Sequence, residues 1–197
     1  MSDNTVDPAR RRFLTGTTAV IGGLGAAAAA IPFVASFQPS AKAKAIGAPI
    51  KVDIAKLEPG QRVTHKWRGQ PVWIVRRTPE MLDKLKALGD DTLRDPNSEE
   101  SEQPEYATNA WRSEKEEYLI LVGLCTHLGC SPSFIPEVGE MDNEWPGGFF
   151  CPCHGSKFDL AGRVYSGVPA PTNMRVPPYR FESDTQIVIG EDAGGAA

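Results

Sequence analysis

The chain has 197 residues, of which 41% are hydrophobic and 23% charged, with a formal net charge of −4. These values are those of an ordinary globular protein, and the length allows one domain with a real core plus an appendage. The net negative charge and the lack of a lysine and arginine stripe exclude a nucleic acid as the expected partner.

The N-terminal segment has the pattern of an export signal. Arg10 and Arg11 are followed, after one residue, by Phe13-Leu14 and a run without charges, which resembles a twin-arginine signal. Residues 17–37 are long enough, at about 1.5 Å per residue of helix, to cross a hydrocarbon core. We therefore expect a cytoplasmic tail over 1–16 and a transmembrane anchor over 17–37, with the remainder outside the membrane. Signal cleavage is the alternative, but the apolar run exceeds the roughly 7–15 residues of an ordinary signal core.

The segments on either side of the main domain have a simple composition. Residues 38–47 are small and polar, which is typical of a linker, and we expect a flexible hinge there. The domain itself is expected over 48–191. The tail 192–197 is rich in glycine and alanine, which predicts a disordered end.

From Ile50 onward the pattern predicts mainly β structure. β-branched and aromatic runs separated by turn residues indicate many short strands, and therefore an antiparallel sandwich. The strands are expected at 61–67, 70–77, 118–124, 148–151, 157–160, 163–165, 179–182 and 186–189. An insertion over 78–117 should begin with a helix capped by Thr78-Pro79 and ended by Gly89. Its remainder, 90–117, is polar and acidic and is expected to loop over the surface.

All four cysteines and two of the three histidines lie in two short motifs. The motifs are Cys125-Thr126-His127-Leu128-Gly129-Cys130 and Cys151-Pro152-Cys153-His154-Gly155-Ser156. Structural zinc would need four ligands and leave two cysteines idle. Two disulfides would give no reason for a histidine in each motif. An iron–sulfur cluster in which two histidines replace two cysteines on one iron accounts for every residue.

These motifs resemble, position by position, the C-T-H-x-G-C and C-P-C-H-G-S motifs of the Rieske family. The resemblance implies one [2Fe–2S] cluster in a Rieske-type β-sandwich with a cluster-binding subdomain. It implies that Cys125 and Cys151 bind one iron and that His127 and His154 bind the other. Cys130 and Cys153 would then form a disulfide between the two loops.

The same resemblance implies roles around the cluster. Ser156 occupies the position whose hydroxyl donates to a cluster sulfide. Phe158 stands where high-potential members have a tyrosine that donates to a cysteine sulfur, which predicts a somewhat lower potential here. The segment 167–171 resembles the proline-rich loop that shields the cluster, and Leu128 resembles the exposed apolar tip. The expected docking and shielding residues are Leu128, Gly129, Pro152, Pro169 and Pro171.

The anchor, the linker and the insertion make the chain similar to the Rieske subunits of bacterial quinol–cytochrome c reductases. The disulfide cysteines separate it from oxygenases and small ferredoxins, and a small subunit of an arsenite-oxidase-type periplasmic enzyme is the alternative. The resemblance implies that quinol, bound at cytochrome b, gives one electron to the cluster and a proton to His154, which with His127 forms the expected catalytic pair. The electron would pass to cytochrome c1 by movement of the domain, as a step of proton translocation. The partners would be cytochrome b and cytochrome c1 in a dimeric complex of the bacterial inner membrane.

Overall fold

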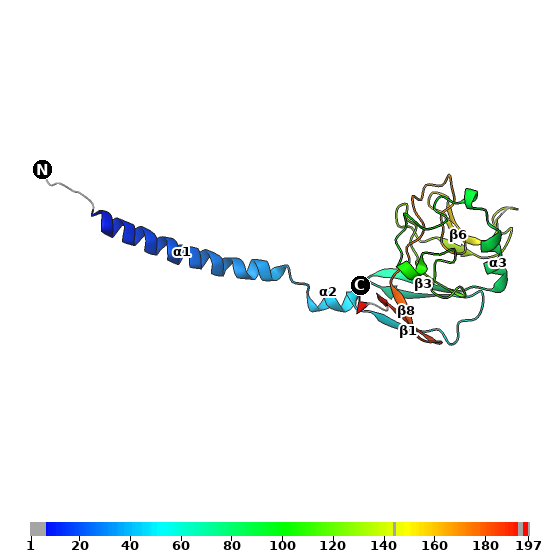
Figure 1. Cartoon of the computed structure of the whole chain (residues 1–197), viewed down its shortest axis with the longest axis horizontal. Coiled ribbons are helices and arrows are strands. Elements are labelled where there is room, and N and C mark those ends of the chain that lie inside the picture. Colours follow the sequence, from blue (N-terminus) through cyan, green and yellow to red (C-terminus); the bar gives the residue numbers. More distant parts are fainter. Residues whose placement is uncertain (1–6, 144, 193–194, 197) are drawn as a thin grey trace. The chain divides into compact units, whose positions relative to one another are not determined.

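The computed structural model describes residues 7–143, 145–192 and 195–196. It divides into two compact units, residues 1–45 and 46–197, each of which is described by itself (Figure 1).

The first unit is dominated by one long helix, α1 (Pro8–Ser36). The Asp7 carboxylate accepts a hydrogen bond from the Ala9 N–H at 2.9 Å, and a proline at the first helical position fits a helix start. The helix therefore begins well before the predicted span and includes Arg10 and Arg11. By length and composition it is apolar enough to cross a membrane. Residues 1–6 of the predicted cytoplasmic tail lie outside the described residues.

The predicted linker contains a second helix, α2 (Ala41–Gly47), and its flexibility stays a prediction. The Ser40 hydroxyl accepts from the Ala43 N–H at 3.2 Å, and the Ser40 carbonyl accepts from the Lys44 N–H at 3.0 Å. Alanine and lysine are strong helix formers, so the composition that suggested a linker also favours a helix. Such a short helix is marginal in water without tertiary contacts.

The second unit is built from short antiparallel strands, which confirms the predicted fold class. Its sheets have the strand orders β1-β9-β8, β2-β3-β4 and β5-β6-β7, and β10 pairs with β11. The strands are β1 (Ile50–Asp53), β2 (Arg62–Trp67), β3 (Gln70–Arg76), β4 (Tyr118–Val122), β5 (Ser133–Ile135), β6 (Gly148–Cys151), β7 (Ser156–Phe158), β8 (Tyr179–Ser183), β9 (Gln186–Ile189), β10 (Glu191–Asp192) and β11 (Gly195–Ala196). In Figure 1, β6 lies toward the end of this unit that is away from β1 and β8.

The core forms around the neighbouring strands β3 and β4. All five residues of β4 are buried, as its continuous apolar run predicts. Gly123, just after β4, lies so close to the Trp73 ring that an added Cβ would overlap it. Cys125 and Cys151 belong to the same buried cluster as Phe149 and Phe158. The first cysteine of each motif is therefore part of the hydrophobic core.

The insertion contains the predicted helix, α3 (Pro79–Ala87), and two short 3₁₀ turns, Asp90–Thr92 and Glu105–Ala107. The Thr78 hydroxyl accepts from the Met81 N–H at 3.3 Å, as a helix cap does. Met81 and Leu85 are buried with Leu160 and Ala161.

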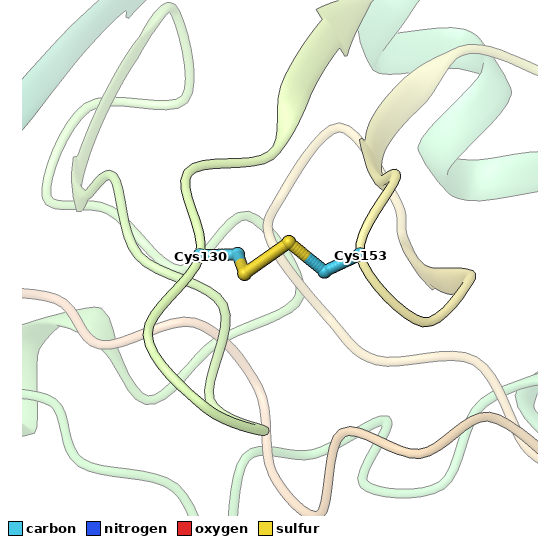
Figure 2. Close-up of a disulfide and its surroundings, with 2 residues drawn as sticks. All are labelled: Cys130 and Cys153. Carbon is cyan, nitrogen blue, oxygen red and sulfur yellow. A yellow bond between two sulfur atoms is a disulfide. The ribbon is translucent and has the colours of Figure 1, made fainter.

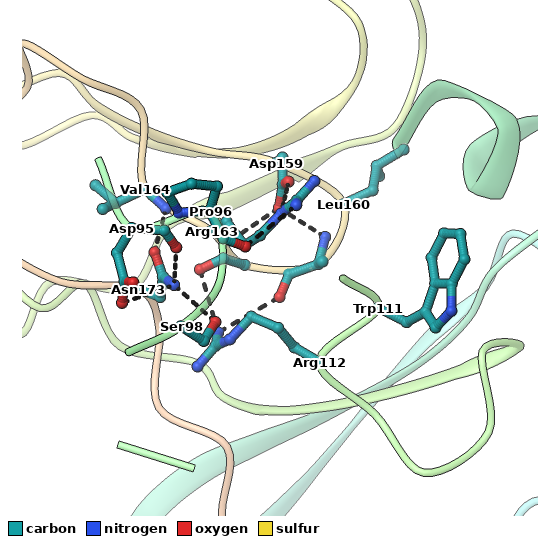
Figure 3. A network of polar contacts seen from close by, with 12 residues as sticks. Asp95, Pro96, Ser98, Trp111, Arg112, Asp159, Leu160, Arg163, Val164 and Asn173 are labelled. Carbon is teal, nitrogen blue, oxygen red and sulfur yellow. Dashed lines mark hydrogen bonds and ion pairs between the residues drawn. The ribbon is translucent and has the colours of Figure 1, made fainter. Parts of the chain in front are cut away.

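The remainder of the insertion is mostly irregular and at least partly exposed, as predicted, but some of its polar side chains are buried. Arg112 is 0% exposed, and its guanidinium donates to the Met174 carbonyl at 2.6 Å and to the Gln103 side chain at 3.0 Å. Asp95 is also buried, in a polar network that reaches Arg163 and Asn173 (Figure 3). Hydrogen bonds offset part of the cost of this burial: the Asp95 carboxylate, for example, accepts from the Glu99 N–H at 2.7 Å, within the insertion itself.

The C-terminal tail also differs from the prediction of disorder from residue 192. Glu191–Asp192 pairs with Gly195–Ala196, and Arg180 of β8 donates to Glu191 at 2.9 Å through Nε. This ion pair ties β10 to the neighbouring strand. Residues 193, 194 and 197 lie outside the described residues.

Candidate metal centre

The two motifs form turns of the same conformation. In the first, which follows β4, the Cys125 carbonyl accepts from the Gly129 N–H at 2.9 Å. In the second, between β6 and β7, the Cys151 carbonyl accepts from the Gly155 N–H at 2.9 Å. Both glycines have φ of +78°, a conformation that side-chain-bearing residues rarely adopt. The glycine in each motif is therefore required by the turn that presents the cysteine and the histidine.

A disulfide joins the two turns. Cys130 and Cys153 are bonded with their Cα atoms 6.7 Å apart, and Figure 2 shows the bond bridging the two loops. The pairing is the one that the resemblance implied. The Sγ atoms of Cys130, Cys151 and Cys153 all lie within 4.8 Å of one another, so the bridge lies beside the Cys151 thiol.

The other two cysteines remain thiols. Cys125 and Cys151 are 3% and 1% exposed, and neither takes part in a disulfide. Burial raises the pKa of the Cys125 thiol, whereas hydrogen bonds from the His127 backbone and the Ser156 side chain lower it. The Cys151 thiol also raises the pKa of the Cys125 thiol.

The two histidines lie next to each other. The ring centroids of His127 and His154 are 4.7 Å apart and the ring planes are at 82°. His154 is exposed and His127 is half-buried. The Nδ1 atom of His127 is buried and has no hydrogen-bond partner among the described residues. A buried ring nitrogen without a partner is available to ligate a metal.

The site therefore offers two buried thiols and two adjacent imidazoles. This donor set fits the [2Fe–2S] cluster in which cysteines hold one iron and histidines hold the other. It also fits a tetrahedral zinc ion, since the disulfide leaves no cysteine idle. The geometry alone thus narrows the site to a metal centre with two sulfur and two nitrogen ligands.

The two residues expected to tune the cluster potential, Ser156 and Phe158, are both fully buried. Ser156 is 0% exposed, and its Oγ accepts from the Ala170 N–H at 3.0 Å. Phe158 is 0% exposed and pairs with Phe149 across β6 and β7.

The expected docking residues form an exposed rim. Leu128 is 72% exposed, and Gly129, Pro152, Pro169 and Pro171 are exposed as well. Arg10 and Arg11 of the export signal belong to α1, in the other unit. His65, in β2, lies outside both motifs.

The sequence patterns missed the residues that hold the proline-rich loop. The Thr126 hydroxyl of the first motif donates to the Thr172 carbonyl at 2.7 Å. Arg94 of the insertion donates to the carbonyls of Val168 and Ala170 at 3.2 and 3.0 Å. These partners are far apart in the sequence, so no local spacing could have revealed them.

Comparison with known proteins decides the class of the metal centre. The family described as "Rieske [2Fe-2S] domain" matches residues 50–180, and the family described as "Ubiquitinol-cytochrome C reductase Fe-S subunit TAT signal" matches residues 1–40. The chain thus carries a Rieske [2Fe–2S] domain behind a twin-arginine signal.

Relatives narrow this class further. The ubiquinol–cytochrome c reductase iron–sulfur subunit of Allochromatium vinosum is 54% identical over 100% of this chain and 95% of its own length. The protein of the same name from Bradyrhizobium diazoefficiens is 43% identical over 93% of this chain and 95% of its own. A chain of a structure titled "Hyperthermophilic respiratory Complex III" aligns with 89% of this chain and 98% of its own at 24% identity, with a TM-score of 0.47. The chain belongs to the family of ubiquinol–cytochrome c reductase iron–sulfur subunits. The arsenite-oxidase-type alternative is not favoured by these relatives.

Proposed function

We propose that this chain is the electron-carrying subunit of a quinol–cytochrome c reductase, anchored in the bacterial inner membrane with its Rieske domain in the periplasm. The observation that carries the proposal is the pair of facing turns, which bring two buried thiols and two adjacent imidazoles together beside a disulfide. The full-length similarity to ubiquinol–cytochrome c reductase subunits supports it.

The ligand roles follow from burial and charge. Cys125 and Cys151, which are almost fully buried, would hold one iron as thiolates, and His127 and His154 would hold the other. A Rieske cluster, when bound, takes up and releases one electron at a higher potential than an all-cysteine cluster does. The core beneath the thiols excludes water from the sulfur ligands, and the disulfide holds the two loops at a fixed separation.

His154 is the residue that meets quinol in this proposal. Its imidazole is exposed, and one ring nitrogen remains for a hydrogen bond when the other binds metal. With the ring deprotonated, that nitrogen would accept a proton from the quinol hydroxyl as the electron leaves the quinol. The exposed apolar side chain of Leu128, with Pro152 and Pro169, would seat the domain against the apolar entrance of the quinol site on cytochrome b.

The connection to the membrane would allow the domain to move between partners. Residues 37–40 and 48–49 lie outside regular structure, and the short α2 lies between them. Pivoting over 38–47 would carry the domain from cytochrome b to cytochrome c1, which is a hinge motion. We propose a dimeric complex with both cytochromes, in which this step contributes to proton translocation.

Fractionation of membranes tests the assembly and the orientation. We expect the chain to stay in membranes after a carbonate wash, to purify with b-type and c-type haems, and to be digested by protease added to spheroplasts. Release by carbonate would contradict the anchor, and purification without haems would contradict the assembly. Protection from protease in spheroplasts would contradict the periplasmic orientation.

A further inference from the structure

Residues 92–94 of the insertion lie beside residues 164–166, the segment that leads into the proline-rich loop 167–171. The Arg94 N–H donates to the Val164 carbonyl at 3.0 Å, and the Ser166 N–H donates to the Thr92 carbonyl at 2.9 Å. These two bonds fix the backbone of the insertion beside the segment that precedes the loop. They also place the Arg94 side chain next to the loop itself.

The Arg94 guanidinium holds the loop on both sides of Pro169. Nη2 donates to the Val168 carbonyl at 3.2 Å and Nη1 donates to the Ala170 carbonyl at 3.0 Å. The planar guanidinium of an arginine can donate to two acceptors at a fixed spacing. A lysine ammonium group has the same charge but cannot make this bidentate pair of hydrogen bonds. The two carbonyls are therefore held in one orientation relative to each other.

The Ala170 N–H, which lies between these two carbonyls along the backbone, connects the loop to the second motif. The Ala170 N–H donates to Ser156 Oγ at 3.0 Å, and both residues are 0% exposed. A hydroxyl that accepts from an N–H must direct its own hydrogen elsewhere. Ser156 lies directly opposite Cys151 in the pairing of β6 with β7, so this hydroxyl lies at the metal centre.

We propose that Arg94 is a positioning residue for the metal centre: by holding the carbonyls of Val168 and Ala170, it orients the Ala170 N–H, which in turn fixes the Ser156 hydroxyl beside Cys151. This inference rests on the proposed function, in which Cys151 is a ligand. A donor to a ligand sulfur stabilises the reduced, more negative state and raises the potential. The insertion would thus tune the centre through the proline-rich loop.

The far end of the loop is fixed without Arg94. Asn173 accepts from the Val164 N–H at 2.8 Å through Oδ1 and donates to the Asp95 carbonyl at 2.9 Å through Nδ2 (Figure 3). The Ser101 hydroxyl accepts from the Asn173 N–H at 3.2 Å. Replacement of Arg94 should therefore loosen the middle of the loop while its end stays in place.

A double-mutant cycle on the full-length protein in its membranes tests the inference. Arg94→Gln removes both the charge and the bidentate hydrogen bonding, whereas Arg94→Lys keeps the charge and removes only the bidentate hydrogen bonding. Each variant is made alone and in combination with Ser156→Ala. The readout is the midpoint potential of the Rieske signal in redox titrations followed by electron paramagnetic resonance. We expect both Arg94 variants to lower the potential when Ser156 is present and to cause no further shift in the Ser156→Ala background.

Three results would overturn the inference. An equal shift in both backgrounds would mean that Arg94 does not act through Ser156, and the absence of any shift would mean that it does not tune the centre. Loss of the cluster in both Arg94 variants would mean that Arg94 is needed to build the site, not to position one hydroxyl. Failure of the proposed ligand roles is distinguishable, because the unmutated protein would then show no Rieske signal at all.

Discussion

The imidazole rings of His127 and His154 meet edge to face, with their centroids 4.7 Å apart. They come from different loops, and each loop is closed by a glycine with φ of +78°. The contact depends on two turns of the same conformation joined by the disulfide. Neither motif alone provides a pair of imidazoles.

The first prediction concerns this pair. His154→Ala should abolish the Rieske signal and the bound iron, because one iron would keep a single imidazole ligand. Thiol alkylation with mass analysis should show that the Cys130–Cys153 disulfide is retained. The matched control is His65→Ala in β2, which should keep both the iron and the signal. A His154→Ala protein with an unchanged signal would contradict the ligand assignment.

The second prediction concerns the disulfide, whose cysteines are separated by 23 positions. Replacing both Cys130 and Cys153 by serine should lower the free energy of unfolding by about 3 kcal/mol, mainly through the freedom gained by the unfolded chain. Thermal unfolding of the cluster-loaded protein measures this change. Wild-type protein with its disulfide reduced should behave like the double variant. Equal melting temperatures for the variant and the oxidised wild type would refute the structural role.

The third prediction concerns Phe158, which is fully buried. Phe158→Tyr should raise the midpoint potential by roughly 20–60 mV, if one hydrogen bond to a ligand sulfur is worth about 0.5–1.5 kcal/mol. Protein-film voltammetry measures the shift. Phe134→Tyr, in the half-buried aromatic group around Phe149, adds the same hydroxyl elsewhere and should leave the potential unchanged. If the midpoint potential of Phe158→Tyr did not rise, the proposed role of position 158 in tuning the potential would be wrong.

The fourth prediction concerns the helix α2 in the linker. Lys42→Pro with Lys44→Pro should break α2 and stiffen the backbone, so that quinol-dependent reduction of cytochrome c slows while the cluster spectrum stays intact. Lys42→Ala with Lys44→Ala removes the same charges and keeps a helix-forming sequence, so turnover should be close to that of the wild type. Undiminished turnover in the proline variant would count against a mobile domain.

The parts of the fold that the sequence predicted well have local signals. The buried run of β4 and the cap at Thr78 each depend on neighbouring residues, and the structure has both. The paired motifs could be recognised for the same reason, because each turn lies within six consecutive residues. The two motifs indicate the Rieske class without any tertiary contact.

The parts that the sequence did not predict depend on distant partners or on ambiguous composition. Arg112 and Asp95 lie in a polar segment, and their burial depends in part on distant partners: the Met174 carbonyl accepts from Arg112, and the Asn173 side chain donates to the Asp95 carbonyl. Arg94 meets the proline-rich loop only through the tertiary fold. The segment 38–47 was ambiguous because alanine and lysine suit both a linker and a helix.

The most direct test of the central claim is electron paramagnetic resonance of reduced membranes that contain this chain, with and without an inhibitor of the quinol site. We expect a Rieske signal whose line shape changes when the inhibitor binds, because in the proposed role His154 would face the quinol site of cytochrome b. A Rieske signal that does not respond to the inhibitor would contradict the role in quinol oxidation, and the absence of the signal would contradict the cluster itself.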